Sequence, residues 1–192
     1  MTAPQLFDLS DLGVAVPDDW QWSLVIRVTG VPQPAGSKSG FATFRKVDGQ
    51  RVYTGNIAVV DSGTAASRDR HKSWRALVAE AAQEAMAGAD PWLGAVLIRS
   101  TFTMPRPKSH YGTGRNEGVL KVNAPTWHVS KPDRGKIERS VEDSLKDGGV
   151  YKDDTQTCVS QAFKVYTRPP QFRLIADAMP IPGVVVRLWR LP

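Results

Sequence analysis

The stretch that decides the fold is KPDRGKIERSVEDSLKDGGVYKDDTQ, residues 131–156. Three of its apolar residues recur every four positions, a spacing that places one apolar stripe along an amphipathic helix. They are Ile137, Val141 and Leu145. We expect this helix to run from about 134 to 146, because two glycines at 148–149 then stop the pattern. Residues 150–166 read as a turn followed by a strand.

Upstream of this stretch, alternating strands surround one more helix. The sequence predicts a strand at 24–29, a loop at 31–39, a hairpin of short strands at 41–61 about Asp48 and Gly49, a helix at 67–86 and a strand at 95–104. The helix should end at Gly88 and bury Trp74, Leu77, Val78, Ala81, Ala82 and Ala85. In the last of these strands, one face should hold Val96, Ile98 and Phe102.

This order of elements favours an α+β fold, because strands predominate and the second helix follows a long loop. We expect a single domain at 23–192 with a mixed β-sheet and two main helices. Segments 172–176 and 184–189 would supply one or two closing strands. Residues 1–22, rich in Asp and Pro, read as an N-terminal arm.

Composition narrows the setting in which the chain works. No run approaches the roughly 20 apolar residues of a membrane span, and we expect neither a signal peptide nor a membrane anchor. The only cysteine, Cys158, cannot form an intramolecular disulfide, which fits a reducing compartment. We interpret Cys158 as a buried packing residue.

Positive charge gathers in one segment. The formal net charge of the chain is +6, which suggests an anionic partner. Between Pro105 and Arg139 there are eight Lys or Arg residues and three acids, a local net charge of +5. The candidate nucleic-acid-binding residues are Arg106, Lys108, Arg115, Lys121, Lys131, Arg134 and Lys136. Tyr111 and Trp127 lie in the same loop, where an aromatic ring can stack on an exposed base.

Acidic residues mark both ends of the predicted second helix. Asp133 precedes the helix, and Asp153 and Asp154 stand in the turn beyond it. Each has an ordinary interpretation, as an N-cap or a turn former. If the following strand runs back beside the start of the helix, Asp154 and Asp133 converge. Carboxylates placed in this way can hold Mg²⁺ or Mn²⁺.

On the helix itself, Arg139 and Asp143 are four residues apart and share one face with Lys136. As a solvated ion pair, this spacing contributes about 0.2–0.5 kcal/mol. Beside a metal site, the same spacing would fix a cation that holds a scissile phosphate or its developing charge. Periodicity alone does not choose between the two interpretations.

The three histidines do not follow a metal-ligand spacing. His71, His110 and His128 are interpreted as surface or loop residues, although the last two could touch phosphate. The chain also lacks a Cys-rich zinc pattern, a phosphate-binding glycine loop and a nucleophile elbow. Zinc and nucleotide cofactors are therefore not expected.

The decisive stretch resembles the RusA-like Holliday junction resolvases, which are metal-dependent DNA endonucleases. The pattern of that family is Asp-x-Asp-Asn, often after Lys-Pro, then a helix with a lysine and Asp-x-Leu, then Gly-Val and Asp-Asp-x-Gln. The matching positions, all in one register, are Lys131, Pro132, Asp133, Arg139, Asp143, Leu145, Gly149, Val150, Asp153, Asp154 and Gln156. At one of them, Arg139 stands in place of the usual lysine.

The resemblance implies a RusA-like fold and a homodimer with two symmetric sites that cuts four-way DNA junctions by paired nicks in recombination and repair. It implies that Asp133 and Asp154 are catalytic metal-binding acids and that Arg139 is the essential basic residue. Asp143 and Asp153 would be supporting metal ligands. The implied cofactor is Mg²⁺ or Mn²⁺, and the implied partner is branched DNA. Such a protein works in the cytoplasm of a bacterial or phage-infected cell.

One departure from the family pattern bears on activity. Gly135 stands where the family has its second metal-binding aspartate, and Lys136 replaces the asparagine. Loss of one carboxylate should weaken Mg²⁺ binding or leave the ion more hydrated. Three explanations are open: a naturally impaired junction binder, a variant inactivated for study, or an active enzyme in which Glu138 or Asp143 substitutes.

Two other functions are open at this stage. A non-cleaving protein that binds branched or single-stranded DNA would contact phosphates through residues 105–133, which we call the basic loop. Tyr111 or Trp127 would stack on bases. An RNA-binding protein unrelated to recombination is the less favoured alternative. Comparing Mg²⁺-dependent cleavage of a four-way junction with that of linear duplex separates all three.

Overall fold

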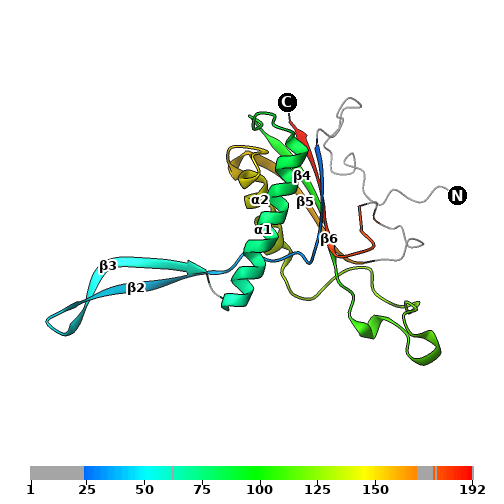
Figure 1. Cartoon of the computed structure of the whole chain (residues 1–192), viewed down its shortest axis with the longest axis horizontal. Coiled ribbons are helices and arrows are strands. Elements are labelled where there is room, and N and C mark those ends of the chain that lie inside the picture. The colour runs from blue at the N-terminus through cyan, green and yellow to red at the C-terminus, as the bar shows by residue number, and fades with distance from the viewer. Residues whose placement is uncertain (1–23, 62, 168–174, 176, 192) are drawn as a thin grey trace.

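The centre of the protein is a sheet of four strands (Figure 1). The computed structural model describes residues 24–61, 63–167, 175 and 177–191. In spatial order the strands are β1 (Leu24–Thr29), β6 (Gly183–Arg190), β4 (Val96–Met104) and β5 (Thr157–Tyr166). Strand β4 runs parallel to β5 and antiparallel to β6, which is antiparallel to β1. The sheet is therefore mixed.

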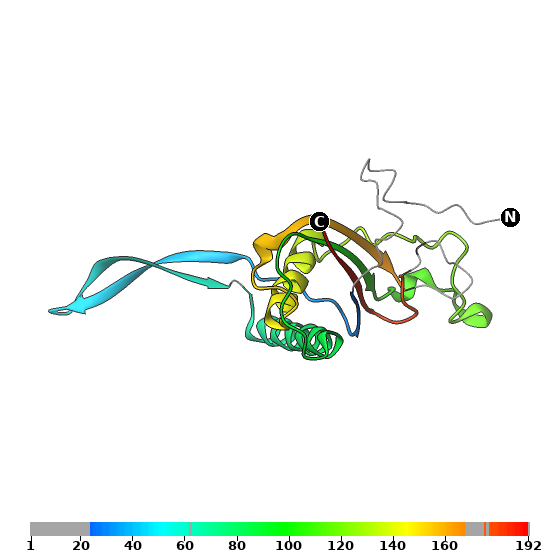
Figure 2. The ribbon, with the colours of Figure 1, turned by 90° about the horizontal axis from the view of Figure 1, so that it is seen from above.

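Two helices cover one face of this sheet (Figure 2). Helices α1 (Ala65–Met86) and α2 (Arg134–Asp147) pack against each other and share a core with the sheet. The core includes Trp74, Val78 and Ala82 of α1, the stripe Ile137, Val141 and Leu145 of α2, and Ile26, Ile98, Phe102 and Val186 of the strands. This arrangement confirms the predicted α+β fold with a mixed sheet and two main helices.

The opposite face of the sheet is covered as well. Asp177, in the connection that leads to β6, accepts two hydrogen bonds of 2.7 Å from Arg187 and is 8% exposed. The backbone N–H of Met179 donates a 3.0 Å hydrogen bond to Thr103 on β4. The predicted face of β4 with Val96, Ile98 and Phe102 lies in the core, and the other face is covered too, since eight of the nine residues of β4 are buried. A central strand covered on both faces has no solvent side.

Two residues predicted to be buried are exposed. Leu77 is 46% exposed, because the core-facing stripe of α1 passes through Trp74 and Val78. Cys158 is exposed because it lies at the start of β5, an edge strand of the sheet. The boundaries of α1 also differ slightly from the prediction, since the C-cap is Ala87 and not Gly88.

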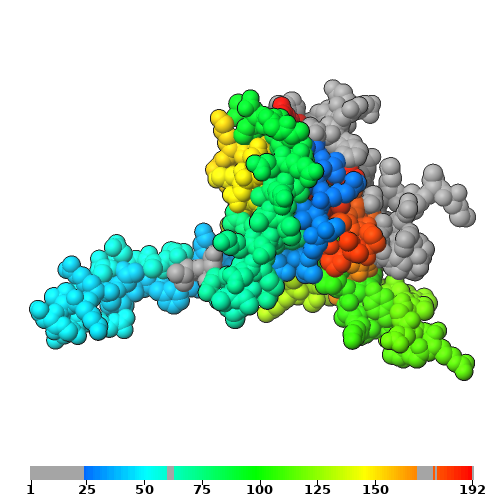
Figure 3. Space-filling model, viewed as in Figure 1, coloured from blue at the N-terminus to red at the C-terminus, as the bar shows by residue number. Residues whose placement is uncertain are grey.

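A long hairpin extends from the body of the protein (Figures 1 and 3). Its strands, β2 (Lys38–Val47) and β3 (Gln50–Asp61), pair antiparallel. The two residues of its turn, Asp48 and Gly49, have φ angles of 49° and 82°. Two successive left-handed residues match the right-handed twist of the flanking strands. The hairpin is confirmed, but its strands are longer than predicted.

The loop between β4 and α2 forms a second projection, on the other side of the body from the hairpin (Figure 1). It contains only two short 3-10 turns, η2 (Lys108–His110) and η3 (Gly114–Asn116). The absence of a long element in this loop agrees with the prediction. The predicted arm at 1–22 and most of the predicted strand at 172–176 lie outside the described residues. None of the described helices has the length and apolar character needed to cross a membrane.

Helices α1 and α2 approach each other closely where α2 ends. A Cβ atom on Gly148, the C-cap of α2, would lie 2.6 Å from the carbonyl oxygen of Ala79 and 2.7 Å from the Cβ of Ala82. At the start of the same helix, a Cβ atom on Gly135 would meet nothing within 4 Å. Packing therefore requires glycine at Gly148 but not at Gly135.

We expect Gly148→Ala to lower the free energy of unfolding by about 1–3 kcal/mol, the usual cost of overpacking a close contact. Gly135→Ala is the matched control, because it adds the same methyl group at the other end of the helix. It should be neutral or stabilising by up to about 1 kcal/mol. Urea denaturation measures both values, and equal stability of the two variants would contradict the close contact between the helices.

Candidate active site between helix α2 and strand β5

Strand β5 runs back along helix α2. Near the end of β5, the Nζ atom of Lys164 donates a 2.7 Å hydrogen bond to the carbonyl of Pro132, which precedes the helix. At the other end, Lys146 in the last turn of the helix forms a 2.8 Å ion pair with Asp153, which precedes β5. Asp133 therefore lies at one end of this helix and strand pair, and the turn of Asp153 lies at the other.

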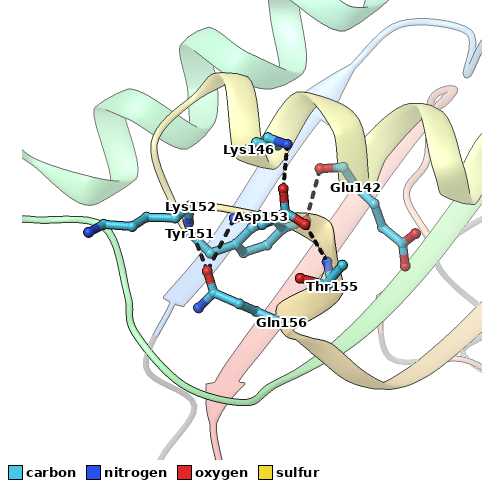
Figure 4. Close-up of polar contacts among 7 residues, drawn as sticks. All are labelled: Glu142, Lys146, Tyr151, Lys152, Asp153, Thr155 and Gln156. Carbon is cyan, nitrogen blue, oxygen red and sulfur yellow. Dashed lines mark hydrogen bonds and ion pairs between the residues drawn. The ribbon is translucent and has the colours of Figure 1, made fainter.

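The turn η4 (Asp154–Gln156) is held rigidly by a capping box (Figure 4). The carboxylate of Asp153 accepts a 3.1 Å hydrogen bond from the backbone N–H of Thr155. The Gln156 side chain accepts a 3.2 Å hydrogen bond from the backbone N–H of Asp153. The hydrogen bond from Lys146 is the main reason why the pKa of Asp153 lies well below its usual range. The hydrogen bonds from Thr155 lower this pKa further. Asp153 thus stabilises the turn, and Asp154 stands exposed next to it.

Glu142 lies at the centre of a group of acids. Burial raises its pKa to about 7, and the nearby carboxylates of Glu138, Asp154 and Asp143 add to the rise, while Arg139 opposes it. We call Glu138, Glu142, Asp143 and Asp154 the acidic cluster. Its members come from one face of α2 and from η4, so the return of the chain toward β5 brings them together.

Glu138 connects the acidic cluster to β5 and to the start of the helix. Its Oε1 atom accepts a hydrogen bond from the hydroxyl of Ser160 on β5. Its Oε2 atom lies 3.2 Å from the guanidinium of Arg134, and its side chain is 13% exposed. Glu138 is therefore oriented from two sides, and Arg134, a predicted DNA-binding residue, forms an ion pair within the site.

Asp133 has different neighbours from Asp154. It occupies the N-cap position of α2 but makes no capping hydrogen bond, and its side chain is 67% exposed. Its closest ion-pair partner is Lys136, at 3.8 Å. Burial lowers the pKa of Lys164, and the Asp133 carboxylate opposes this shift. The Asp133 carboxylate is thus accessible and has cations, not acids, beside it.

The residues present suit a partly hydrated divalent ion better than an enclosed one. Within the described ranges, no three His, Cys, Asp or Glu side chains are placed to hold one ion. Mg²⁺ commonly keeps several waters and needs only one or two carboxylates, which the acidic cluster offers. The predicted ligands are spread along α2 and η4, with Asp133 and the turn of Asp154 at opposite ends of the helix, and metal binding by each of these acids stays a prediction.

The structure places Glu142 in the candidate site, a position that we did not predict from the sequence. A signal was present, because Glu138 and Glu142 are four residues apart and such a like-charge pair destabilises an isolated helix. The burial of Glu142 could not be inferred, since it depends on the chain beyond the helix. In that part of the chain, the hydroxyl of Tyr151 donates a 2.9 Å hydrogen bond to the backbone carbonyl of Glu142 (Figure 4).

The predicted DNA-binding residues divide into two groups. Arg106 is partly buried, donates a 2.7 Å hydrogen bond to the carbonyl of Pro125 and lies 5.2 Å from the ring centroid of Tyr166. Lys121 donates a 2.9 Å hydrogen bond to the carbonyl of Ser109. These two residues therefore shape the loop. The exposed members of the set that remain are Lys108, Arg115, Lys131, Arg134 and Lys136.

His128 lies in the loop between β4 and α2, as predicted, but its side chain is not on the surface. It is 8% exposed, and its ring lies 4.7 Å from that of Tyr166, because the loop folds back over the end of β5. Burial lowers its pKa. The ring centroids of His110 and Tyr166 are 4.8 Å apart in a T-shaped arrangement, and the Nε2 atom of His71 forms a 3.0 Å hydrogen bond with the hydroxyl of Ser140.

The fold and the site together define a protein suited to act on nucleic acid, because a carboxylate cluster and a strongly basic loop share one segment of the chain. A family model described as endodeoxyribonuclease RusA matches residues 48–174. This protein belongs to the RusA endodeoxyribonuclease family of Holliday junction resolvases. The resemblance found in the sequence is thereby confirmed. No curated protein matches the chain.

We expect Glu142→Gln to remove a pH-dependent loss of stability. The folded-state pKa of Glu142, about 7, lies above the ordinary value of 4.5, so ionisation costs stability as the pH rises between these values. The variant should equal the wild type near pH 4 and exceed it by about 1–2 kcal/mol near pH 8, with allowance for partial exposure.

Urea denaturation in EDTA at the two pH values provides the measurement. Glu80→Gln is the control, because Glu80 is an exposed glutamate on helix α1. That substitution controls for the loss of one glutamate charge away from the acidic cluster. A Glu142→Gln protein whose stability follows the wild type at both pH values would show that the folded-state pKa is ordinary.

Proposed function

We propose that this protein is a Holliday junction resolvase that acts as a homodimer and needs Mg²⁺ or Mn²⁺ to cut four-way DNA junctions in recombination and repair. The observation that carries the proposal is the family match, which includes all of α2, η4 and β5. The acidic cluster and the basic loop both lie within the matched segment. Residues for holding a cation and residues for holding phosphates are therefore close in the chain.

We assign the role of metal-binding acids to Asp133 and Asp154, with Asp143 and Asp153 in support. A bound ion would supply water activation and stabilisation of the leaving 3′ oxygen. The acidic cluster supports the assignment of Asp154, because its combined negative charge favours a divalent cation. The exposed carboxylate at the N-cap, which makes no capping hydrogen bond, supports the assignment of Asp133.

Arg139 is proposed to hold the scissile phosphate. It is exposed on α2, and its charge acts on the carboxylate of Glu142. A guanidinium in this position can form two parallel hydrogen bonds to a phosphate and stabilise charge that develops there. Lys108, Arg115 and Lys131 would hold the phosphates of the flanking duplex, since their side chains are exposed on the basic loop.

Gly135 favours a second candidate, a protein that binds branched or single-stranded DNA without cutting it. A glycine at this position removes one carboxylate from the start of α2, where only Asp133 is left. Phosphate contacts from the loop do not depend on that carboxylate. Binding and cleavage should therefore separate at Gly135.

We expect Gly135→Asp to increase Mg²⁺-dependent cleavage of a four-way junction about tenfold, which corresponds to about 1.4 kcal/mol of transition-state stabilisation. Junction affinity should change little. The new side chain has room, because a Cβ atom at this position has no neighbour within 4 Å. Nicking at saturating protein across a Mg²⁺ titration measures the gain.

Gly135→Asn is the matched control, because asparagine has the same shape as aspartate and removes the same glycine flexibility without adding charge. It should leave cleavage at the wild-type level. Strong cleavage by the wild type, unimproved by Gly135→Asp, would show that another acid already supplies the missing ligand. Binding without cleavage by both proteins would support the non-cleaving candidate.

We expect the triple substitution of Lys108, Arg115 and Lys131 by Gln to weaken junction binding and reduce its salt dependence. Each lost phosphate contact should lower the slope of log affinity against log salt by about 0.9 on duplex arms. Fluorescence anisotropy in EDTA at several salt concentrations measures the slope. Arg27→Gln, an exposed site on β1, is the control. An unchanged slope would mean that the loop is only a solvated surface.

A further inference from the structure

The hairpin of β2 and β3 is long, and among the described elements its strands have no extensive contact with the sheet or helices of the body. Its ten-residue first strand spans about 30 Å at about 3.3 Å per residue. Figures 1 and 3 show that it points away from the sheet and helices. An isolated two-stranded hairpin is marginally stable in water. A projecting ribbon of this length is therefore expected to have a binding partner.

The end of the hairpin carries an aromatic and cationic face, which we call the tip face. Phe44 pairs with Tyr53 and Lys46 pairs with Arg51 across the two strands. Side chains two positions apart share a face of a strand, so these four residues lie on the same side. The intervening pair, Arg45 and Val52, points to the other side.

The residues of the tip face are arranged for stacking. The ring centroids of Phe44 and Tyr53 are 5.9 Å apart, and the guanidinium carbon of Arg51 lies 4.6 Å from the Phe44 centroid. Phe44 is 47% exposed and Tyr53 is 49% exposed. Large rings that are half-exposed beside cations are well suited to a flat, negatively charged ligand.

The charge of the tip favours nucleic acid over a second protein surface. Between Phe44 and Tyr53 there are three basic residues and one acid. Aromatic rings interleaved with basic residues are how proteins hold single-stranded or unpaired nucleotides, with the rings stacking on bases and the cations contacting phosphates. The hairpin and the basic loop also extend on opposite sides of the body, so they can reach different arms of one junction (Figure 2).

We propose that the tip face binds the branch point of a DNA junction, where Phe44 and Tyr53 stack on unpaired bases and Lys46 and Arg51 contact the adjoining phosphates. This inference rests on the proposed function and adds a site for recognising branched structure. In linear duplex the bases are already stacked on one another, so the two rings have no equivalent surface. The hairpin thus distinguishes junction from duplex.

The test uses the full-length protein in EDTA, a four-way junction with 2-aminopurine at the branch point, and a linear duplex of the same sequence. Phe44→Ala combined with Tyr53→Ala should weaken junction affinity about tenfold, or about 1.4 kcal/mol. The affinity for duplex should fall less than about twofold, because phosphate contacts are unchanged. Quenching of 2-aminopurine fluorescence on binding should also be lost.

Two matched controls locate the effect on the tip face. Arg51→Gln should weaken junction binding more than Arg45→Gln, because only Arg51 shares a face with the aromatic pair. Ile57→Ala, at a 64% exposed apolar site nearer the base of the hairpin, should bind the junction like the wild type. All substituted side chains lie outside the hydrophobic core, so the variants should keep the wild-type melting temperature.

Four outcomes would overturn the inference. Equal losses of junction and duplex affinity would make the tip a general phosphate contact. Conversion of a dimer to a monomer by the double variant, seen by analytical ultracentrifugation, would make the tip a contact between copies of this chain. If the double variant bound junctions as tightly as the wild type, the role of the hairpin would be contradicted but the proposed function would not. If the wild-type protein failed to bind junctions, both would be contradicted.

Discussion

The burial of one stripe of helix α2 fixes the geometry on which the rest of the structure depends. Ile137, Val141 and Leu145 are fully buried against the sheet, so the helix cannot rotate without exposing them to water. With this stripe held, Glu138 and Glu142 must face the returning chain, and Gly148 must meet α1. A hydrophobic constraint therefore orients the acids, whose own repulsion would otherwise separate them.

The carboxylates of the acidic cluster repel one another, which costs stability when no ligand is bound. Their position in the candidate site offers a reason for this cost. Glu142 is partly buried next to three other carboxylates, and its pKa is raised first by burial and then by these neighbouring negative charges. Proteins tend to break local rules of stability at functional sites, where a ligand supplies the missing compensation. A divalent cation would provide the positive charge that the acidic cluster lacks. Under the proposed function, the group of acids that weakens the fold is the group that would bind the ion.

Under the proposed function, the body, the hairpin and the basic loop would have separate roles in recognising DNA. The body holds the acids at fixed positions, because packing on both faces of the sheet leaves it little freedom. The two projections carry exposed basic and aromatic side chains that lie outside the hydrophobic core. Their opposite directions, seen in Figures 1 and 2, suit a ligand that is itself branched. A protein that recognises branched DNA needs contacts with more than one arm, because each arm by itself is ordinary duplex.

The sequence by itself determined the local elements and the family. The four-residue period of Ile137, Val141 and Leu145, the glycines after them and the turn at Asp153 fixed α2, its end and the start of β5, because these signals depend on near neighbours in the chain. Only the tertiary structure decided which acids meet. The antiparallel return of β5 separates Asp133 from η4 and buries Glu142 near Asp154, and it places Cys158 on an open edge. Such outcomes depend on contacts between distant segments, which residue spacing does not encode.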